Sequence, residues 1–95
     1  MIRLKHVSFE WNVNKNLENQ LKHGVSFEEA QWAFTDINRV IIEDLDHSTS
    51  ERRYFCLGKV ARGILTVRFT YRANTIRIYG AGYWRKGRRR YEDEQ

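Results

Sequence analysis

The stretch that decides the fold is Ile64-Leu65-Thr66-Val67-Arg68-Phe69-Thr70-Tyr71-Arg72-Ala73-Asn74-Thr75-Ile76-Arg77-Ile78-Tyr79. Apolar and polar side chains alternate on both sides of the turn Ala73-Asn74, which is typical of an antiparallel hairpin with one buried face. Leu65, Val67, Phe69 and Tyr71 share one face with Ile76 and Ile78, and of these Leu65, Val67, Phe69, Ile76 and Ile78 are expected in the core. The opposite, open face is expected to present Thr66, Arg68, Thr70, Arg72, Arg77 and Tyr79.

Similar patterns extend the sheet toward the amino terminus. Residues 40–44 and 52–60 are rich in β-branched and aromatic side chains, and a polar loop, residues 45–51, separates them. The short turn Ala61-Arg62-Gly63 leads into the hairpin, so successive strands are expected to pair antiparallel in a meander of about four strands. Residues 7–11 alternate as a further short strand, and residues 85–94 are predicted as a carboxy-terminal helix.

Two helices are predicted between residue 12 and residue 36. Asn12 is suited to cap the first helix, whose apolar stripe of Val13, Leu17 and Leu21 is expected to face the core, and Gly24 is suited to end it. Ser26 and Glu29 have the spacing of a capping box. The buried face of this second helix is expected to be Phe27, Ala30, Ala33 and Phe34. The fold class is therefore α+β, with two helices packed on one face of the sheet.

Charge divides the chain into two unlike halves. Residues 52–91 contain twelve Lys or Arg and no Asp or Glu, whereas residues 1–51 contain five basic and nine acidic side chains. The formal net charge is +5. Aromatic side chains are interleaved with the basic ones, which favours contact with a polyanion, most commonly a nucleic acid. A basic domain that meets an acidic partner protein is the alternative.

Length and composition bound the class of protein. The chain of 95 residues is enough for a single domain, residues 1–95, with one core. The single cysteine, Cys56, excludes an intramolecular disulfide and is typical of a reducing compartment. No apolar run approaches the roughly 18–20 residues that cross a bilayer, and residues 1–6 lack the apolar stretch of a signal peptide. We therefore expect a cytoplasmic protein that does not contact a membrane.

The histidines and carboxylates do not have the spacing of a metal site. His6, His23 and His47 are far apart in the sequence, and Asp44 and Asp46 are typical of a solvated loop. No metal ion or cofactor is expected.

Several blocks of sequence occur in a characteristic order. The most specific is Lys22-His23-Gly24-Val25-Ser26-Phe27-Glu28-Glu29-Ala30, which follows Phe9-Glu10-Trp11-Asn12 and precedes Asp46-His47-Ser48. Further matches are Glu51 with Arg53, Gly58, Phe69-Thr70, Arg72, and Arg77-Ile78 followed by Ala81. Together they resemble the BrnT toxin family of bacterial type II toxin–antitoxin systems, over about residues 8–92.

This resemblance implies a fold, an activity and a partner. The fold would be RelE-like, and the activity would be that of a ribonuclease that inhibits translation. The partner would be an antitoxin of BrnA type, a ribbon-helix-helix protein that neutralises the toxin. Operator DNA would be bound only through the complex of the two proteins.

The chain departs from the family pattern near its carboxy terminus. Many members have Ser-Ala-Arg after the last strand, where this chain has Gly80-Ala81-Gly82. The Glu of a Glu-Arg pair has no counterpart in the basic run before Tyr91. Two functions therefore stay open: an active ribonuclease, or a catalytically weak or inactive homologue that binds the antitoxin and regulates the operon.

Metal-independent RNA cleavage needs a base for the 2′-hydroxyl, positive charge for the phosphorane and a proton for the 5′-oxygen. His23 is the candidate base; its alternative role is that of a cation at a helix carboxy terminus. Arg72 and Arg77 flank the hairpin turn and are the candidates to clamp a phosphate. Lys22 or Arg85 would steady the leaving group.

The residues predicted to bind RNA are Lys22, Arg53, Arg68, Tyr79, Arg85 and Lys86. For Arg53 the alternative is an ion pair with Glu51, and Tyr79 would stack on a base or donate to a phosphate. For His47 we favour a hydrogen bond within its loop, and for Trp84 and Tyr91 an anchoring role under the last helix.

Overall fold

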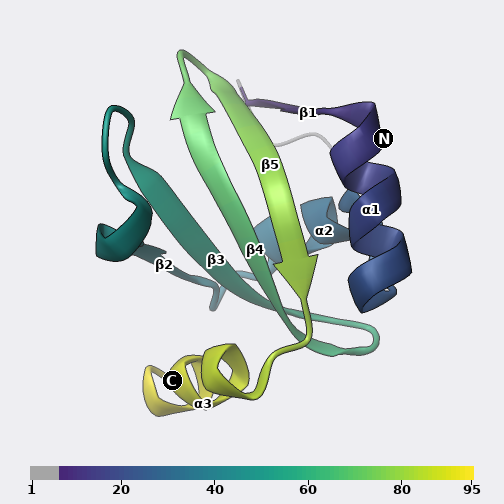
Figure 1. Cartoon of the computed structure of the whole chain (residues 1–95). Helices are drawn as coiled ribbons and strands as arrows, with labels where there is room; N and C mark the ends of the chain where they lie inside the picture. Colours follow the sequence, from purple (N-terminus) through teal and green to yellow (C-terminus); the bar gives the residue numbers. More distant parts are fainter. Residues whose placement is uncertain (1–6) are drawn as a thin grey trace.

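The structure is a computed structural model that describes residues 7–95 (Figure 1). Residues 1–6, which include His6 and on which the expectation of no signal peptide rests, lie outside the described part. The elements in chain order are β1 (Ser8–Trp11), α1 (Val13–His23), α2 (Phe27–Ala30), the 3-10 helix η1 (Gln31–Thr35), β2 (Val40–Glu43), the 3-10 helix η2 (Leu45–His47), β3 (Arg53–Val60), β4 (Gly63–Arg72), β5 (Thr75–Gly82) and α3 (Arg85–Asp93).

The strands form one mixed sheet in the order β1-β5-β4-β3-β2. The antiparallel meander from β2 to β5 and the α+β class are confirmed. The expectation of about four strands was wrong, because β1 joins the sheet as a fifth strand, parallel to β5, with Ser8 opposite Thr75. The meander leaves one edge of β5 without a partner, and β1 satisfies the backbone groups of that edge.

The buried face of the hairpin is the predicted one. Tyr71 shares this face but is 47% exposed, because it lies near the end of β4 beside the turn. On the opposite face two threonines expected to be open are buried: α3 covers Thr66, and Thr70 donates its hydroxyl to the Arg52 carbonyl at 2.6 Å. The side chains confirmed in the core, each 3% exposed or less, are Leu65, Val67, Phe69, Ile76 and Ile78.

α2 and η1 lie behind the sheet in Figure 1 and close the core. Ser26 caps α2 as predicted, since its Oγ accepts from the Glu29 backbone N–H at 3.0 Å. The reciprocal half of the capping box does not form. The Glu29 carboxylate instead accepts from the Arg62 guanidinium at 2.6 and 2.9 Å and from the Tyr83 hydroxyl. The side chains that face the sheet, each at most 2% exposed, are Phe27, Ala30, Ala33 and Phe34.

α1 begins and ends where the sequence predicts. The Asn12 side chain accepts from the Lys15 backbone N–H at 3.0 Å. Gly24 follows the helix in the left-handed region, with φ of 68°, and its N–H donates to the Gln20 carbonyl. These two signals are local, so they do not depend on what the helix packs against.

The face that α1 turns to the core is not the predicted one. The apolar stripe expected to be buried lies outside, while Asn16 and Asn19 are 7% exposed and form the inner face. Asn19 donates to the carbonyls of Val25 and Ala81, both at 2.9 Å, and Asn16 accepts from the Phe27 N–H at 2.8 Å. These bonds satisfy backbone groups that would otherwise be buried without partners, so they set the rotation of the helix.

α3 is held against the rest of the molecule by Tyr91. Its hydroxyl donates to Asp36 Oδ2 at 2.5 Å, and this bond, together with burial, raises the pKa of Tyr91 to about 12.

In residues 7–95 there is no helix with the length and apolar character needed to cross a membrane.

Candidate nucleic-acid site

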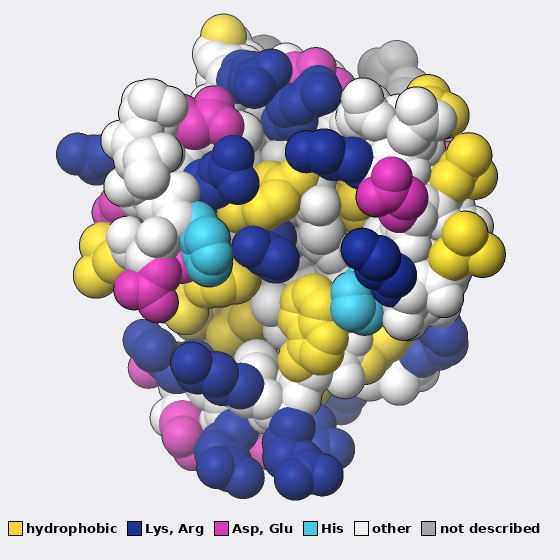
Figure 2. All heavy atoms as spheres, viewed as in Figure 1, with side chains coloured by type: hydrophobic (Ala, Val, Ile, Leu, Met, Phe, Trp, Pro, Cys, Tyr) yellow, Lys and Arg dark blue, Asp and Glu magenta, His cyan; other side chains and the backbone are white. Residues whose placement is uncertain are grey.

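The open face of the sheet carries a hollow that cationic side chains surround (Figure 2). Hydrophobic side chains show at its floor, Lys and Arg side chains lie around it, and two histidine side chains lie on opposite sides. Comparison with Figure 1 places the hollow over β3, β4 and β5, between α1 and the loop after β2, with α3 below.

A β-bulge places Tyr79 next to two arginines on this face. Arg68 pairs with Gly80 and Phe69 pairs with Ile78, so Tyr79 is an extra residue in β5. The guanidinium carbon of Arg68 lies 5.1 Å from the centroid of the Tyr79 ring, and that of Arg53 lies 4.6 Å from it. Both distances are within the range of cation–π attraction, so the ring holds two guanidinium groups close together.

Two hydrogen-bonding groups in this cluster are left unused. Arg68 Nε and the Tyr79 hydroxyl are buried, and neither has a hydrogen-bond partner among residues 7–95. A buried donor without an acceptor costs about 1–3 kcal/mol, and most such groups in proteins are paired. Arg68 and Tyr79 are therefore prepared to donate to an acceptor that the chain itself does not supply.

The carboxy-terminal turn of α1 completes a cavity of about 220 Å³ beside these groups. Lys22 and His23 line this cavity together with Arg68, Tyr79 and Trp84. The His23 ring meets Trp84 edge to face, with 5.2 Å between centroids. The structure thus brings together four of the residues predicted from the sequence, and it adds Trp84, for which we had expected only an anchoring role. The role of Trp84 was missed because the ring that it meets, His23, lies on α1, far from Trp84 in the sequence.

Gly80 and Gly82 give room to two of these side chains. A Cβ on Gly80 would lie 3.2 Å from Arg68 Cδ, and a Cβ on Gly82 would lie 2.5 Å from the Trp84 ring. The second distance is shorter than real Cβ contacts, so a larger residue at position 82 would displace the tryptophan. This chain has Gly80 and Gly82 where many family members have Ser and Arg. The two glycines leave the space that the side chains of Arg68 and Trp84 occupy.

Arg72 and Arg77, the predicted phosphate clamp, do not line this cavity. Arg77 Nη1 lies 2.9 Å from a Glu10 carboxylate oxygen, and Arg72 Nη2 lies 3.7 Å from Glu51. Glu51 also lies 3.7 Å from Arg53, as the alternative reading of that arginine anticipated. These pairs are partly exposed and worth about 0–1 kcal/mol each, so an RNA phosphate can compete for the guanidinium groups.

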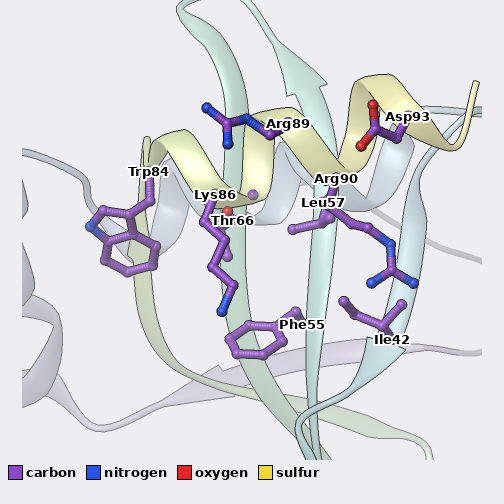
Figure 3. Close-up of a pocket in the computed structure, with 10 residues that line it drawn as sticks. Ile42, Phe55, Leu57, Thr66, Trp84, Lys86, Arg89, Arg90 and Asp93 are labelled. Atoms are coloured by element: carbon purple, nitrogen blue, oxygen red, sulfur yellow. The ribbon is translucent and has the colours of Figure 1, made fainter.

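The remaining predicted residues lie at the start of α3. Lys86 lines a second cavity, of about 550 Å³, between α3 and the open face of the sheet, and Trp84 borders both cavities. In Figure 3 Lys86 extends toward the ring of Phe55, whereas Arg89 points away from the cavity. Arg85 lines a third cavity together with Arg62 and Tyr83.

Two further groups, His47 and Cys56, lie outside the cavity that Lys22 and His23 line. His47 Nδ1 lies 2.7 Å from Asp44 Oδ2, the hydrogen bond within the loop that we favoured for it. Cys56 is fully buried, and burial raises the pKa of its thiol to about 12, so it is not a nucleophile near neutral pH. Residues 7–95 contain no group of three or more His, Cys, Asp or Glu placed to hold a metal ion.

Fold and site together define a class of protein. A small basic α+β domain that gathers guanidinium groups, an ammonium group, an imidazole and aromatic rings in one hollow is suited to bind a polyanion with exposed bases. Comparison with protein families makes the class more specific. The model of the family described as the ribonuclease toxin BrnT of type II toxin–antitoxin systems matches residues 11–87, and the chain belongs to this family. None of the curated proteins compared with the chain matches it.

Membership confirms the resemblance seen in the sequence. It assigns the chain to the ribonuclease toxins of toxin–antitoxin systems, and it implies a partner that acts as antitoxin.

Proposed function

We propose that the chain is an endoribonuclease toxin that cleaves RNA without a metal ion, in the cavity lined by Lys22, His23, Arg68 and Tyr79. The observation that carries the proposal is the pair of buried, unpartnered donors, Arg68 Nε and the Tyr79 hydroxyl. A phosphodiester offers two acceptor oxygens and a negative charge to such donors. Arg68 and Arg53 would hold the scissile phosphate and stabilise the phosphorane, since positive charge aimed at developing negative charge is often the largest catalytic contribution.

The chemistry requires only side chains of this cavity and the substrate's own hydroxyl. His23 accepts the proton of the 2′-hydroxyl, and the 2′-oxygen attacks phosphorus. The bond from phosphorus to the 5′-oxygen breaks, and Lys22 supplies the proton that the departing oxygen takes up. The products are a 5′-hydroxyl end and a 2′,3′-cyclic phosphate, which water can open to a 3′-phosphate.

The surroundings of the cavity support a path for the rest of the strand. Phe55 and Trp84 offer rings for neighbouring bases in the cavity under α3, and Lys86 lies at the same place. Arg72 and Arg77 would meet phosphates farther along the sheet by exchanging their carboxylate partners for RNA.

A cleavage assay with purified protein and RNA in EDTA tests the proposal. Arg68→Ala is expected to lower the rate by about 10²–10³, as the loss of an oxyanion donor does. Tyr79→Phe removes only the hydroxyl and is expected to lower it about tenfold. His23→Ala is expected to lower it about 10²–10⁴ if the imidazole is the base. Arg39→Ala removes an exposed cation outside the hollow and serves as the matched control.

Three results would overturn parts of the proposal. Cleavage that stops in EDTA and returns with Mg²⁺ would refute the metal-free mechanism. Full activity of Arg68→Ala would move the site elsewhere. A wild-type protein that cleaves no RNA and does not inhibit growth when expressed alone would favour the second function, a non-catalytic partner of the antitoxin.

The partner and the outcome in the cell follow from the same proposal. RNA cleavage would inhibit translation, and an antitoxin of BrnA type, a ribbon-helix-helix protein, would neutralise the toxin and bring the complex to operator DNA. Residues 52–91 contain twelve Lys or Arg and no Asp or Glu, which favours an acidic contact segment on that antitoxin, because opposite charges speed association and fix orientation.

A further inference from the structure

The loop between β2 and β3 holds a histidine against a buried carboxylate. His47 Nδ1 donates to Asp44 Oδ2 at 2.7 Å; the Asp44 side chain is 5% exposed and the His47 side chain 55%. The two residues are three apart at η2, and side chains three apart eclipse in a 3-10 helix. Because an ionised carboxylate only accepts hydrogen bonds, Nδ1 carries the hydrogen and Nε2 carries the lone pair. In this arrangement a carboxylate fixes the tautomer and the direction of an imidazole that transfers protons.

Hydrogen bonds tie this pair to the first residue of β3. The Asp44 N–H donates to the Arg53 carbonyl at 2.7 Å. The Ser48 hydroxyl donates to the Asp44 carbonyl at 2.8 Å, and its oxygen accepts from the Arg53 N–H at 2.9 Å. The Arg53 guanidinium lies 4.6 Å from the centroid of the Tyr79 ring, in the cluster proposed to hold the scissile phosphate. The loop that carries His47 is therefore fixed beside that cluster.

The proposed cleavage leaves its second step without a base. Opening of the 2′,3′-cyclic phosphate needs a group that takes a proton from water, and the water attacks phosphorus on the side opposite to the departing 2′-oxygen. His23 is on the side of the 2′-oxygen, because it takes the proton of the 2′-hydroxyl in the first step. Lys22 is its neighbour on α1, and an ammonium group has no acceptor. The base is therefore expected across the hollow from α1.

The loop after β2 lies on that side of the hollow. Figure 2 shows histidine side chains on opposite sides of it, and His23 and His47 are the histidines of residues 7–95. The other acceptor of this loop is Glu51, whose Oε1 lies 3.7 Å from Arg53 and whose Oε2 lies 3.7 Å from Arg72. Each oxygen of Glu51 thus faces a guanidinium group, whereas the His47 ring is open to solvent.

We propose that His47, positioned by Asp44, is the base that activates water for hydrolysis of the 2′,3′-cyclic phosphate. The chain then has a second activity, that of a cyclic phosphodiesterase, and it leaves 3′-phosphate ends. The proposal rests on the proposed function, because the cyclic phosphate is the product of that cleavage.

The protons of this second step balance between the two histidines. His47 Nε2 takes a proton from water as the water oxygen bonds to phosphorus. The bond from phosphorus to the 2′-oxygen breaks, and His23 gives this oxygen the proton that it took in the first step. His47 then releases its proton to solvent, from which Lys22 regains the one that it gave to the 5′-oxygen. Asp44 stays ionised throughout and acts only through His47.

The test supplies the cyclic phosphate directly, so it does not depend on RNA cleavage. The probe is a short oligonucleotide that ends in a 2′,3′-cyclic phosphate, and chromatography follows the formation of the 3′-phosphate. His47→Ala is expected to lower the rate about 10²–10⁴-fold, and added imidazole should restore part of it. Asp44→Asn favours the wrong tautomer, so it should lower kcat by a similar factor and leave KM unchanged. Asp46→Asn is the matched control, because Asp46 is an exposed carboxylate of the same 3-10 helix, and it should react as wild type does.

With RNA as the substrate, His47→Ala should accumulate cyclic ends where the wild type leaves 3′-phosphates. Hydrolysis of the probe by His47→Ala at the wild-type rate would overturn the proposal, and so would a loss in Glu51→Gln alone. A fall in RNA cleavage by His47→Ala as large as its fall in hydrolysis, without rescue by imidazole, would assign the histidine to the fold instead. A wild-type protein that leaves the probe intact would refute the second activity, whether or not it cleaves RNA. Hydrolysis of the probe by a wild-type protein that cleaves no RNA would support the second activity and refute the proposed function.

Discussion

Replacing Asn19 by alanine should destabilise the protein far more than replacing Leu21, against the usual ranking of polar and aliphatic residues. The Asn19 side chain donates to the carbonyls of Val25 and Ala81 and accepts from the Ala81 N–H at 3.2 Å. At about 1 kcal/mol for each bond, and more for a buried group left unpaired, Asn19→Ala should cost about 3 kcal/mol. That is a large part of the 5–15 kcal/mol typical of a domain, and it corresponds to a fall of roughly 12–24 °C in Tm.

Leu21→Ala should change the free energy of unfolding by less than about 0.5 kcal/mol, because Leu21 is 88% exposed. Urea denaturation followed by tryptophan fluorescence measures both variants, and the slope against urea should stay constant. Asn14→Ala is the matched control, since Asn14 is exposed on the same helix. It should be neutral or slightly stabilising, because alanine is the better helix former.

The reverse ranking would refute this account of α1. If Leu21→Ala cost more than Asn19→Ala, the helix would be rotated, and the assignment of Lys22 and His23 to the cavity would fail with it. A neutral Asn19→Ala would show that water or backbone partners replace the side chain.

Three further outcomes are expected. Gly82→Ala places a Cβ 2.5 Å from the Trp84 ring, so its tryptophan fluorescence should shift and its RNA cleavage should fall, whereas an unchanged spectrum would contradict that contact. The Arg62 guanidinium holds the pKa of Glu29 below its ordinary value of 4.5. This ion pair therefore stabilises the fold above pH 4.5, and the stabilisation is lost as pH falls through the lowered pKa. The free energy of unfolding of Glu29→Gln, measured against pH, should lack that part of the acid dependence. Cys56, with a thiol pKa of about 12, should react with iodoacetamide at pH 8 roughly a thousandfold more slowly than free cysteine, and mass spectrometry should find alkylation only as the chain unfolds.

The parts of the fold that the sequence predicted are those with local causes. Asn12, Gly24 and Ser26 satisfy backbone groups within one helical turn, and the register of the hairpin follows from two turn residues and the alternation beside them. Such signals act wherever the segment lies in the molecule, so the sequence contains all the information they need.

The parts that the sequence did not predict depend on distant partners. The stripe of α1 was assigned to the core because periodicity shows that a helix has an apolar face but not what that face meets. Nothing in the sequence indicated that Asn16 and Asn19 would be buried. Their hydrogen-bond partners, near residues 25–27 and at residue 81, are known only from the fold. The parallel pairing of β1 with β5 likewise has no local sign.

The sequence predicted several residues of the candidate site, but it did not predict which of them lie together. The cavity does bring together Lys22, His23, Arg68 and Tyr79. The β-bulge that places Tyr79 next to Arg68, however, has no characteristic residue from which it could be predicted. Arg72 and Arg77 were assigned to the centre from their positions beside the turn and from the family resemblance, and neither lines the cavity. The catalytic roles and the RelE-like relationship stay predictions.

The parallel pairing of the first strand with the last has a consequence for how the protein is made. Ser8 leaves the ribosome early but finds its partner Thr75 only after 67 more residues have been synthesised. Trp84, which also lines the cavity, is synthesised later still. A nascent chain that already contains α1 therefore lacks the other residues of the cavity, Arg68, Tyr79 and Trp84. Domains fold largely as units, and pairing across long separations is slow. A translation product that is interrupted before residue 84 is therefore expected to lack the complete cavity.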